Sequence, residues 1–215
     1  MSDLNCQAIL FDLDGTLVNS AFRVQRLWLE WGNRHGIDPQ SIMGVMHGRR
    51  AGETIRIVAP HLSVEDELNI LENEEISDMA GVSPYSSARD LVNKLSSNQW
   101  AIVTSGTRRV ASARLKYVDL PTPEVFITAE DVKAGKPAPD GYLLAASRLN
   151  VSPSDCVVVE DAPAGIHAGK SAGMRVIAIA SSISKEALSQ ADIVIQQLAD
   201  LRLHVTSSNI NIQWK

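Results

Sequence analysis

The chain has 215 residues, of which 45% are hydrophobic, and a formal net charge of −5. This length allows one sizeable core with a small insert, and the acidic balance argues against nucleic acid as a main partner. The two cysteines, Cys6 and Cys156, are too few for a disulfide framework and favour reduced thiols. No apolar stretch approaches the roughly 20 residues that span a bilayer, and the N-terminus lacks a basic signal region. We therefore expect a cytoplasmic protein with no membrane partner.

The first predicted strand, Ala8–Phe11, leads directly into Asp12-Leu13-Asp14-Gly15-Thr16. Side chains alternate along a strand, so Asp12 and Asp14 are expected to project from the same side. Two like charges this close repel each other, and a cation or a shared proton relieves the repulsion. Gly15 permits a tight turn that brings the backbone close to a ligand. The segment therefore indicates a Mg²⁺ and phosphate site, although Asp-Gly is also an ordinary turn dipeptide.

From Ala21 to about Gly81 the pattern is helical and contains no convincing strand. The apolar positions of the first helix are predicted to share one face: Phe22, Leu27, Trp28 and Trp31. We place an all-helical insert at residues 19–82, and the core at residues 1–18 and 83–215. Such an insert would lie over the sheet edge where open α/β folds bind ligands. It is predicted to be a lid that excludes water and selects substrate, and a purely packing subdomain is the alternative.

Beyond the insert, strand-like runs alternate with amphipathic stretches of helical period. The runs are Ala101–Thr104, Val125–Ile127, Cys156–Val159, Arg175–Ile179 and Ile193–Ile195. The helical stretches are Ala88–Leu95, Val110–Tyr117, Tyr142–Leu149 and Gly165–Ser171. This alternation predicts an α/β fold with a mostly parallel sheet that is covered on both faces. The polar residues Ser207–Asn211 are expected to form a loose tail.

Two segments beyond the insert offer groups that bind phosphate. Thr104, Ser105 and Gly106 follow a predicted strand, where a hydroxyl and backbone N–H groups can hold a phosphate at a helix N-terminus. Lys136 lies in a loop stiffened by Pro137 and Pro139, and it could neutralise a phosphate oxygen or a nucleophile. A helix cap is the alternative for the first segment, and a simple helix start is the alternative for the second.

Glu160 and Asp161 end the apolar run Cys156–Val159 and repeat the theme of carboxylates at a strand end. In a parallel sheet, a second acidic strand end can meet the first one across the crevice. Together with water, the carboxylates would provide the oxygen ligands that Mg²⁺ prefers. As a helix cap, Asp161 would need no metal.

Together these segments resemble the haloacid dehalogenase superfamily. Its four motifs match in Asp12-Leu13-Asp14-Gly15-Thr16, Thr104, Lys136 and Glu160-Asp161, which follow one another in the family's order. Two segments look like sugar phosphatases related to glycerol-3-phosphatase and 2-deoxyglucose-6-phosphate phosphatase: His47-Gly48-Arg49-Arg50 and Glu160-Asp161-Ala162-Pro163-Ala164-Gly165-Ile166. The resemblance implies a Rossmann-like parallel core with a helical cap inserted after the first strand. Asn19 departs from the pattern, because related sequences often carry an acid there.

The resemblance also implies Mg²⁺-dependent hydrolysis of a small sugar phosphate through an aspartyl-phosphate. Asp12 would be the nucleophile, and Asp14 would act as general acid and then as general base. Mg²⁺ would be held by Asp12, the backbone carbonyl of Asp14 and Asp161, with Glu160 nearby. The transferring phosphoryl group would be bound by residues at two further sites: Thr104, Ser105, Gly106 and Lys136.

Specificity is expected to come from the insert, where His47, Arg49 and Arg50 are the candidate substrate-binding residues. A solvated basic loop is the alternative for the arginines.

A phosphomutase of the β-phosphoglucomutase type shares every core motif, but the mutases resembled carry a lysine where this chain has His47. Dehalogenation of 2-haloacids would need no second acid, and Asp14 argues against it. A non-catalytic protein of this fold would lack the carboxylates that are intact here. We expect a monomer.

Overall fold

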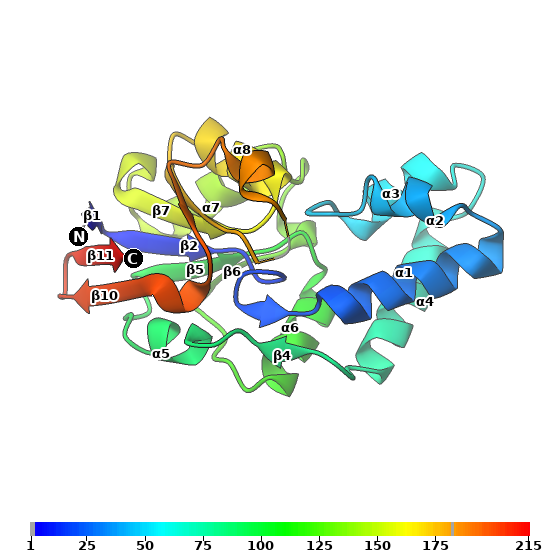
Figure 1. Cartoon of the computed structure of the whole chain (residues 1–215), viewed down its shortest axis with the longest axis horizontal. Coiled ribbons are helices and arrows are strands. Elements are labelled where there is room, and N and C mark those ends of the chain that lie inside the picture. The colour runs from blue at the N-terminus through cyan, green and yellow to red at the C-terminus, as the bar shows by residue number, and fades with distance from the viewer. Residues whose placement is uncertain (1–2, 182) are drawn as a thin grey trace.

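The computed structural model describes residues 3–181 and 183–215 (Figure 1). Its main sheet has six parallel strands in the order β6-β5-β2-β7-β8-β9. The strands are β2 (Ala8–Phe11), β5 (Trp100–Val103), β6 (Val125–Ile127), β7 (Cys156–Glu160), β8 (Arg175–Ile179) and β9 (Ile193–Ile195). All six predicted strands and the parallel α/β fold are confirmed. The differences are at the ends, since β5 starts and stops one residue earlier and β7 extends to Glu160.

Alternate residues of the parallel strands face two separate hydrophobic cores. On one face, Leu10 and Val158 pack with helices α7 (Asp140–Leu149) and α8 (Pro163–Ser171). On the other face, Phe11 and Val159 pack with α5 (Ala88–Val92) and α6 (Arg108–Tyr117). Four short 3₁₀ helices complete this part of the chain: Ala129–Asp131, Pro153–Asp155, Lys185–Leu188 and Leu198–Asp200. Both faces of the sheet are therefore covered, as predicted.

A second, antiparallel sheet brings the two ends of the chain together (Figure 1). Strand β11 (Ile210–Trp214) pairs with β1 (Asp3–Cys6) on one side and with β10 (Leu201–Val205) on the other. The expectation of a loose tail at Ser207–Asn211 is wrong, because Ile210 and Asn211 belong to β11. Ile210 and Ile212 are fully buried in the core that α5 and α6 also share. Polar neighbours hid the period-2 pattern of these two isoleucines, which is the signature of a strand.

Four helices follow β2 and form a compact group at the end of the molecule away from the termini (Figure 1). They are α1 (Ala21–His35), α2 (Pro39–Met43), α3 (Ala51–Val58) and α4 (Val64–Ser77). Leu27, Trp28 and Trp31 are buried in the separate core of this insert. The prediction for Phe22 is wrong, because its side chain is 66% exposed. Phe22 lies nine residues before Trp31, which is about two and a half helical turns and places the two on opposite sides.

The chain enters and leaves the helical insert through a two-stranded ribbon. Strand β3 (Val18–Asn19) pairs antiparallel with β4 (Ser83–Pro84), and Asn19 lies opposite Ser83. Residues 18–19 and 82–83, where the sequence predicts the domain boundaries, lie at this ribbon. The division into a core and a specificity-setting cap stays a prediction.

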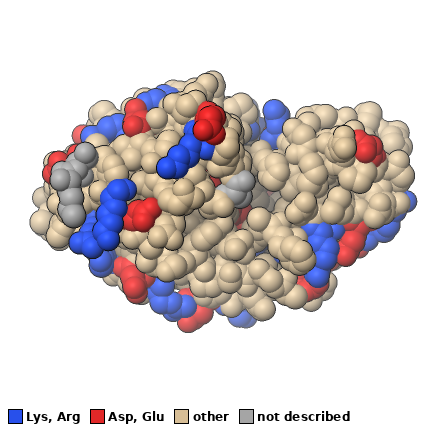
Figure 2. All heavy atoms as spheres, in the orientation of Figure 1, with Lys and Arg blue, Asp and Glu red and all other residues tan. Residues whose placement is uncertain are grey.

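Charged side chains of both signs are scattered over the face of the molecule in Figure 2. On this face, the charge of the chain is therefore spread out and is not gathered in one patch. Among the residues that the structure describes, no helix is long and apolar enough to cross a membrane.

The burial of β11 predicts that the C-terminal strand is structural. Ile212→Ala removes most of a fully buried side chain and is expected to lower the free energy of unfolding by about 2–5 kcal/mol. His204→Ala, on the exposed side of β10, is the control and should change it by less than about 0.5 kcal/mol. Urea denaturation measures both variants. Equal, small effects would contradict a core role for β11.

Candidate active site

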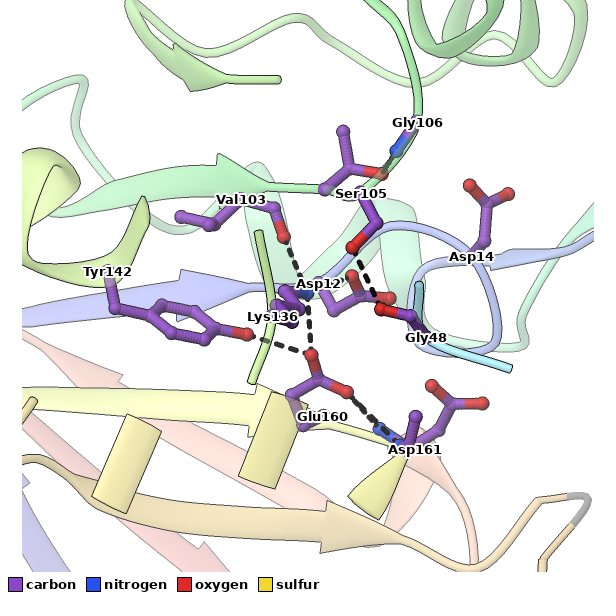
Figure 3. Close-up of polar contacts among 12 residues, drawn as sticks. Asp12, Asp14, Gly48, Val103, Ser105, Gly106, Lys136, Tyr142, Glu160 and Asp161 are labelled. Atoms are coloured by element: carbon purple, nitrogen blue, oxygen red, sulfur yellow. Dashed lines mark hydrogen bonds and ion pairs between the residues drawn. The ribbon is translucent and has the colours of Figure 1, made fainter. Parts of the chain in front are cut away.

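Three buried carboxylates meet at the carboxyl ends of two neighbouring strands (Figure 3). Asp12 directly follows β2, and Glu160 ends β7, with Phe11 and Val159 paired in register just before them. Asp161 is the next residue along the chain. One oxygen from each carboxylate lies within 4.8 Å of the others. The predicted meeting of two acidic strand ends is therefore present in the structure.

Lys136 supplies the positive charge that this cluster needs. Its Nζ donates to Asp12 Oδ1 at 2.5 Å and to Glu160 Oε1 at 2.6 Å, and to the backbone carbonyl of Val103 at 3.0 Å. Burial opposes the charge of the ammonium, but the two carboxylates outweigh it and raise the pKa of Lys136 well above its usual value. The lysine is thus a fixed, ionised bridge between strands.

Glu160 has all its acceptor sites occupied. Oε1 accepts from Lys136 and from the hydroxyl of Tyr142 at 2.9 Å, and Oε2 accepts from the backbone N–H groups of Asp161 at 3.0 Å and Ala162 at 3.1 Å. Tyr142 comes from α7 and is fully buried. The contact of Tyr142 with the site was not predicted, because an aromatic residue on an amphipathic helix is typical of a core position.

Burial and repulsion from neighbouring carboxylates disfavour the ionised forms of Asp12 and Asp161. Burial raises the pKa of Asp12 to about 7, although Lys136 opposes the shift. Burial also raises the pKa of Asp161 well above its usual value, and Glu160 and Asp12 add to the rise. These oxygen donors fit a hard divalent cation, which would relieve the repulsion and favour the ionised carboxylates.

Two glycines let the backbone approach the carboxylates. Gly15 has a φ of +94°, and a Cβ there would lie 1.9 Å from Asp161 Oδ2. A Cβ at Gly165, in the first turn of α8, would lie 1.7 Å from Glu160 Oε1. Neither position can carry a side chain without displacing a buried carboxylate. The glycine turn predicted next to a ligand site therefore contacts Asp161 itself.

Asp14 is held apart from the three-carboxylate cluster. Its side chain points away from Glu160 and Asp161 (Figure 3). Oδ1 accepts from the hydroxyl of Ser20 at 2.7 Å, and Oδ2 pairs with the guanidinium of Arg114. The expected repulsion between Asp12 and Asp14 is thus relieved by two protein cations, Lys136 and Arg114. The role of Arg114 was not predicted from the sequence.

Three of the four residues predicted to bind the phosphoryl group follow β5 and line the cavity beside the carboxylates: Thr104, Ser105 and Gly106. The backbone N–H of Gly106 donates to Thr104 Oγ1 at 3.0 Å. The hydroxyl of Ser105 donates to the backbone carbonyl of Gly48 at 2.9 Å (Figure 3). Ser105 therefore contacts the insert in this structure, and it connects the core to the loop that carries the predicted specificity residues.

The core and the insert share one cavity of about 550 Å³. Asp12, Asp14 and Asp161 line it from the core, and His47 and Arg49 line it as exposed residues of the insert. Arg50 also lines it, but its guanidinium donates to the backbone carbonyls of Val132 at 2.9 Å and Lys133 at 3.0 Å. Apart from Lys136, the predicted residues of core and insert thus line the same cavity, while Arg50 is anchored to a core loop.

Comparison with known proteins places this arrangement among hydrolases. The model of the haloacid dehalogenase-like hydrolases matches residues 6–173. Hexitol phosphatase A of Escherichia coli (strain K12) is 43% identical over 92% of this chain and 94% of its own length. Glycerol-1-phosphate phosphohydrolase 2 of Saccharomyces cerevisiae is 34% identical over 93% of this chain and 86% of its own. The crystal structure of a hydrolase from Pseudomonas syringae shares the fold, with a TM-score of 0.79 at 23% identity over 91% of this chain and 95% of that one.

The raised pKa of Asp12 predicts a stability that depends on pH and on metal. Because the pKa is 3.8 ordinarily and about 7 in the folded protein, the folded state binds the proton more tightly. The contribution of Asp12 to the free energy of unfolding without metal should therefore be greatest below about pH 4 and fall as pH rises to 7, by up to about 1.4 kcal/mol per unit.

Asp12→Asn removes this dependence, so the variant should be more stable than the unsubstituted chain at pH 7–8 in a chelator. Added Mg²⁺ should stabilise the unsubstituted chain more than the variant. Thermal unfolding of both proteins between pH 5 and 8 measures the difference, in which titrating groups outside the cluster cancel. A difference that stays constant across this range would contradict the assignment.

Proposed function

The chain belongs to the haloacid dehalogenase-like hydrolase family, which confirms the resemblance of its motifs, and on this premise we propose that it hydrolyses phosphate monoesters of small sugars or polyols. The observation that carries the proposal is the buried cluster of Asp12, Glu160 and Asp161 with Lys136, beside a cavity shared with the insert. The names of the relatives, a hexitol phosphatase and a glycerol-1-phosphate phosphohydrolase, support a sugar or polyol phosphate as substrate.

Asp12 acts as the nucleophile in this proposal. One of its oxygens forms a bond to phosphorus as the bond from phosphorus to the sugar oxygen breaks, which gives an aspartyl-phosphate. Lys136 stabilises the ionised carboxylate that attack requires, by its contact with Oδ1. Attack of water on phosphorus then releases inorganic phosphate and restores the carboxylate of Asp12.

Asp14 moves the protons of both steps. It gives a proton to the leaving sugar oxygen and then takes one from the attacking water. Thr104, Ser105, Gly106 and Lys136 hold the transferring phosphoryl group, in which positioning and charge stabilisation supply most of the catalysis. The position of the first three along the cavity wall supports this role.

Mg²⁺ is the cation that we assign to the three-carboxylate cluster. The carboxylates of Asp12 and Asp161 and the backbone carbonyl of Asp14 would hold it. Glu160 already accepts four hydrogen bonds, so its role is to orient Asp161 and to add negative charge near the cation. When bound, Mg²⁺ supplies positive charge between the anionic nucleophile and the phosphate.

The helical insert acts as a cap that selects the substrate. His47 and Arg49 line the cavity and are free to contact the sugar, whereas Arg50 acts by docking the loop on the core. A cavity of about 550 Å³ lies within the range for small-molecule sites and accommodates a hexose or hexitol phosphate. A cytoplasmic location and a monomeric state remain predictions.

Asp12→Asn should abolish turnover, because an amide cannot attack phosphorus. Phosphate release from hexitol, hexose and glycerol phosphates with Mg²⁺ should fall at least about 10³-fold, while circular dichroism shows an unchanged fold. Asp90→Asn, an exposed carboxylate of α5, is the control and should retain full activity. A variant that turns over at the rate of the unsubstituted chain would exclude Asp12 as nucleophile.

The product assay also separates the phosphatase from the phosphomutase. With β-glucose 1-phosphate, a phosphatase releases inorganic phosphate, whereas a mutase accumulates glucose 6-phosphate without net release. Accumulation of the 6-phosphate alone would overturn the proposed function.

The docking contacts of Arg50 predict that its removal lowers kcat/KM for a substrate that contacts the insert. Arg50→Met removes both contacts with the core loop and should lower kcat/KM for a hexitol phosphate about tenfold, which is about 1.4 kcal/mol. The inhibition constant for inorganic phosphate, which the core alone binds, should change less than about twofold. Arg26→Met, which removes an ion pair with Asp78, is the control. Weaker phosphate inhibition in Arg50→Met would show that Arg50 contacts the phosphate directly.

A further inference from the structure

Helix α6 carries an arginine on its buried face. Arg114 is 4% exposed and shares that face with Val110, Ala111 and Leu115. A buried guanidinium is stable only when it is paired, because its transfer from water is costly. The partners of Arg114 therefore indicate its role.

Both partners of Arg114 are carboxylates, and they come from different parts of the molecule. Nη1 pairs with Oδ2 of Asp14, which follows β2 in the core, and Nη2 pairs with Oε1 of Glu75, on α4 of the insert. All three residues line the cavity. The planar guanidinium thus fixes the distance between the proposed acid/base and the insert.

The other oxygen of Asp14 is also held. Oδ1 accepts from the hydroxyl of Ser20, which lies at the start of α1. Both oxygens of the carboxylate are therefore oriented by groups outside the three-carboxylate cluster: Ser20 belongs to the insert, and Arg114 pairs with the insert through Glu75.

We propose that Arg114 is a positioning residue that orients Asp14 for proton transfer, and that Glu75 makes this orientation depend on a docked insert. The inference rests on the proposed function, in which Asp14 is the general acid. When α4 lies against α6, Glu75 balances the second half of the guanidinium and Arg114 holds Asp14 in place. When the insert moves away, Arg114 loses one partner and the orientation of Asp14 relaxes.

If Arg114 only docked α4 on α6, its loss would affect all substrates alike. The chain offers a matched control for this alternative. Arg109, also on α6, contacts α4 through Asn73 at 2.6 Å and Glu72 at 3.5 Å. It joins the same two helices but has no contact with Asp14 in the structure. Arg109→Met therefore removes docking contacts alone.

The test compares two leaving groups, a hexitol 6-phosphate and p-nitrophenyl phosphate, by kcat/KM. An alcohol must be protonated as it leaves, whereas nitrophenolate leaves without a proton, and kcat/KM reports this first step. Arg114→Met should lose about 10²-fold or more on the hexitol phosphate and less than about tenfold on p-nitrophenyl phosphate. Arg114→Lys and Glu75→Gln should show smaller losses with the same preference. Arg109→Met should change both by less than about threefold.

Equal losses on the two substrates in Arg114→Lys and Glu75→Gln, or the same pattern in Arg109→Met, would overturn the inference and leave Arg114 as a docking residue. Because Arg114→Met removes a buried charge, thermal unfolding checks that it is folded, and the two milder variants decide the question if it is not. An unsubstituted chain that releases phosphate from neither substrate would overturn the proposed function itself, and with it this inference.

Discussion

The ammonium group of Lys136 is the contact on which the site depends. It joins Asp12, which follows β2, to Glu160, which ends β7, and it also caps the last carbonyl of β5 at Val103. Three neighbouring strand ends are thus held by one buried cation. Without this charge, Asp12 and Glu160 would be two buried carboxylates with nothing to offset their repulsion, and one of them would take up a proton. The hydroxyl of Tyr142 supports the same arrangement from the α7 side of the sheet, by its hydrogen bond to Glu160.

The charge balance of the cluster explains why a further cation fits there. Three carboxylates against one ammonium leave two negative charges when every group is ionised, which one divalent cation balances. The raised pKa values of Asp12 and Asp161 express the same deficit. Asp14 does not share in it, because Arg114 neutralises its carboxylate separately. Two aspartates that are two positions apart in the sequence are therefore given different electrostatic surroundings.

The sequence predicted what local pattern determines, and it missed what only packing determines. Apolar runs ending in Asp12, Thr104 and Glu160 marked the strand ends, since a buried parallel strand has a pattern that stands out from its neighbours. The contact of Tyr142 with Glu160 could not be predicted, because its position in the helical pattern is that of any core residue. Arg114 had a usable signal, because it shares a helix face with Val110, Ala111 and Leu115, and a charge on such a face must have a partner. Its partners, 100 and 39 residues away, could not be read from spacing.

The contacts between insert and core couple the position of the proposed cap to the geometry of the site. Ser105 donates to Gly48, Arg50 donates to Val132 and Lys133, and Arg114 pairs with Glu75. On the core side, these contacts begin at the segment after β5, the loop leading to Lys136 and the partner of Asp14. The insert cannot move without changing the surroundings of a group proposed to bind phosphate or transfer a proton. A substrate that improves the docking of the insert therefore also improves the alignment of the core, so binding energy far from phosphorus can be used to lower the barrier for its transfer.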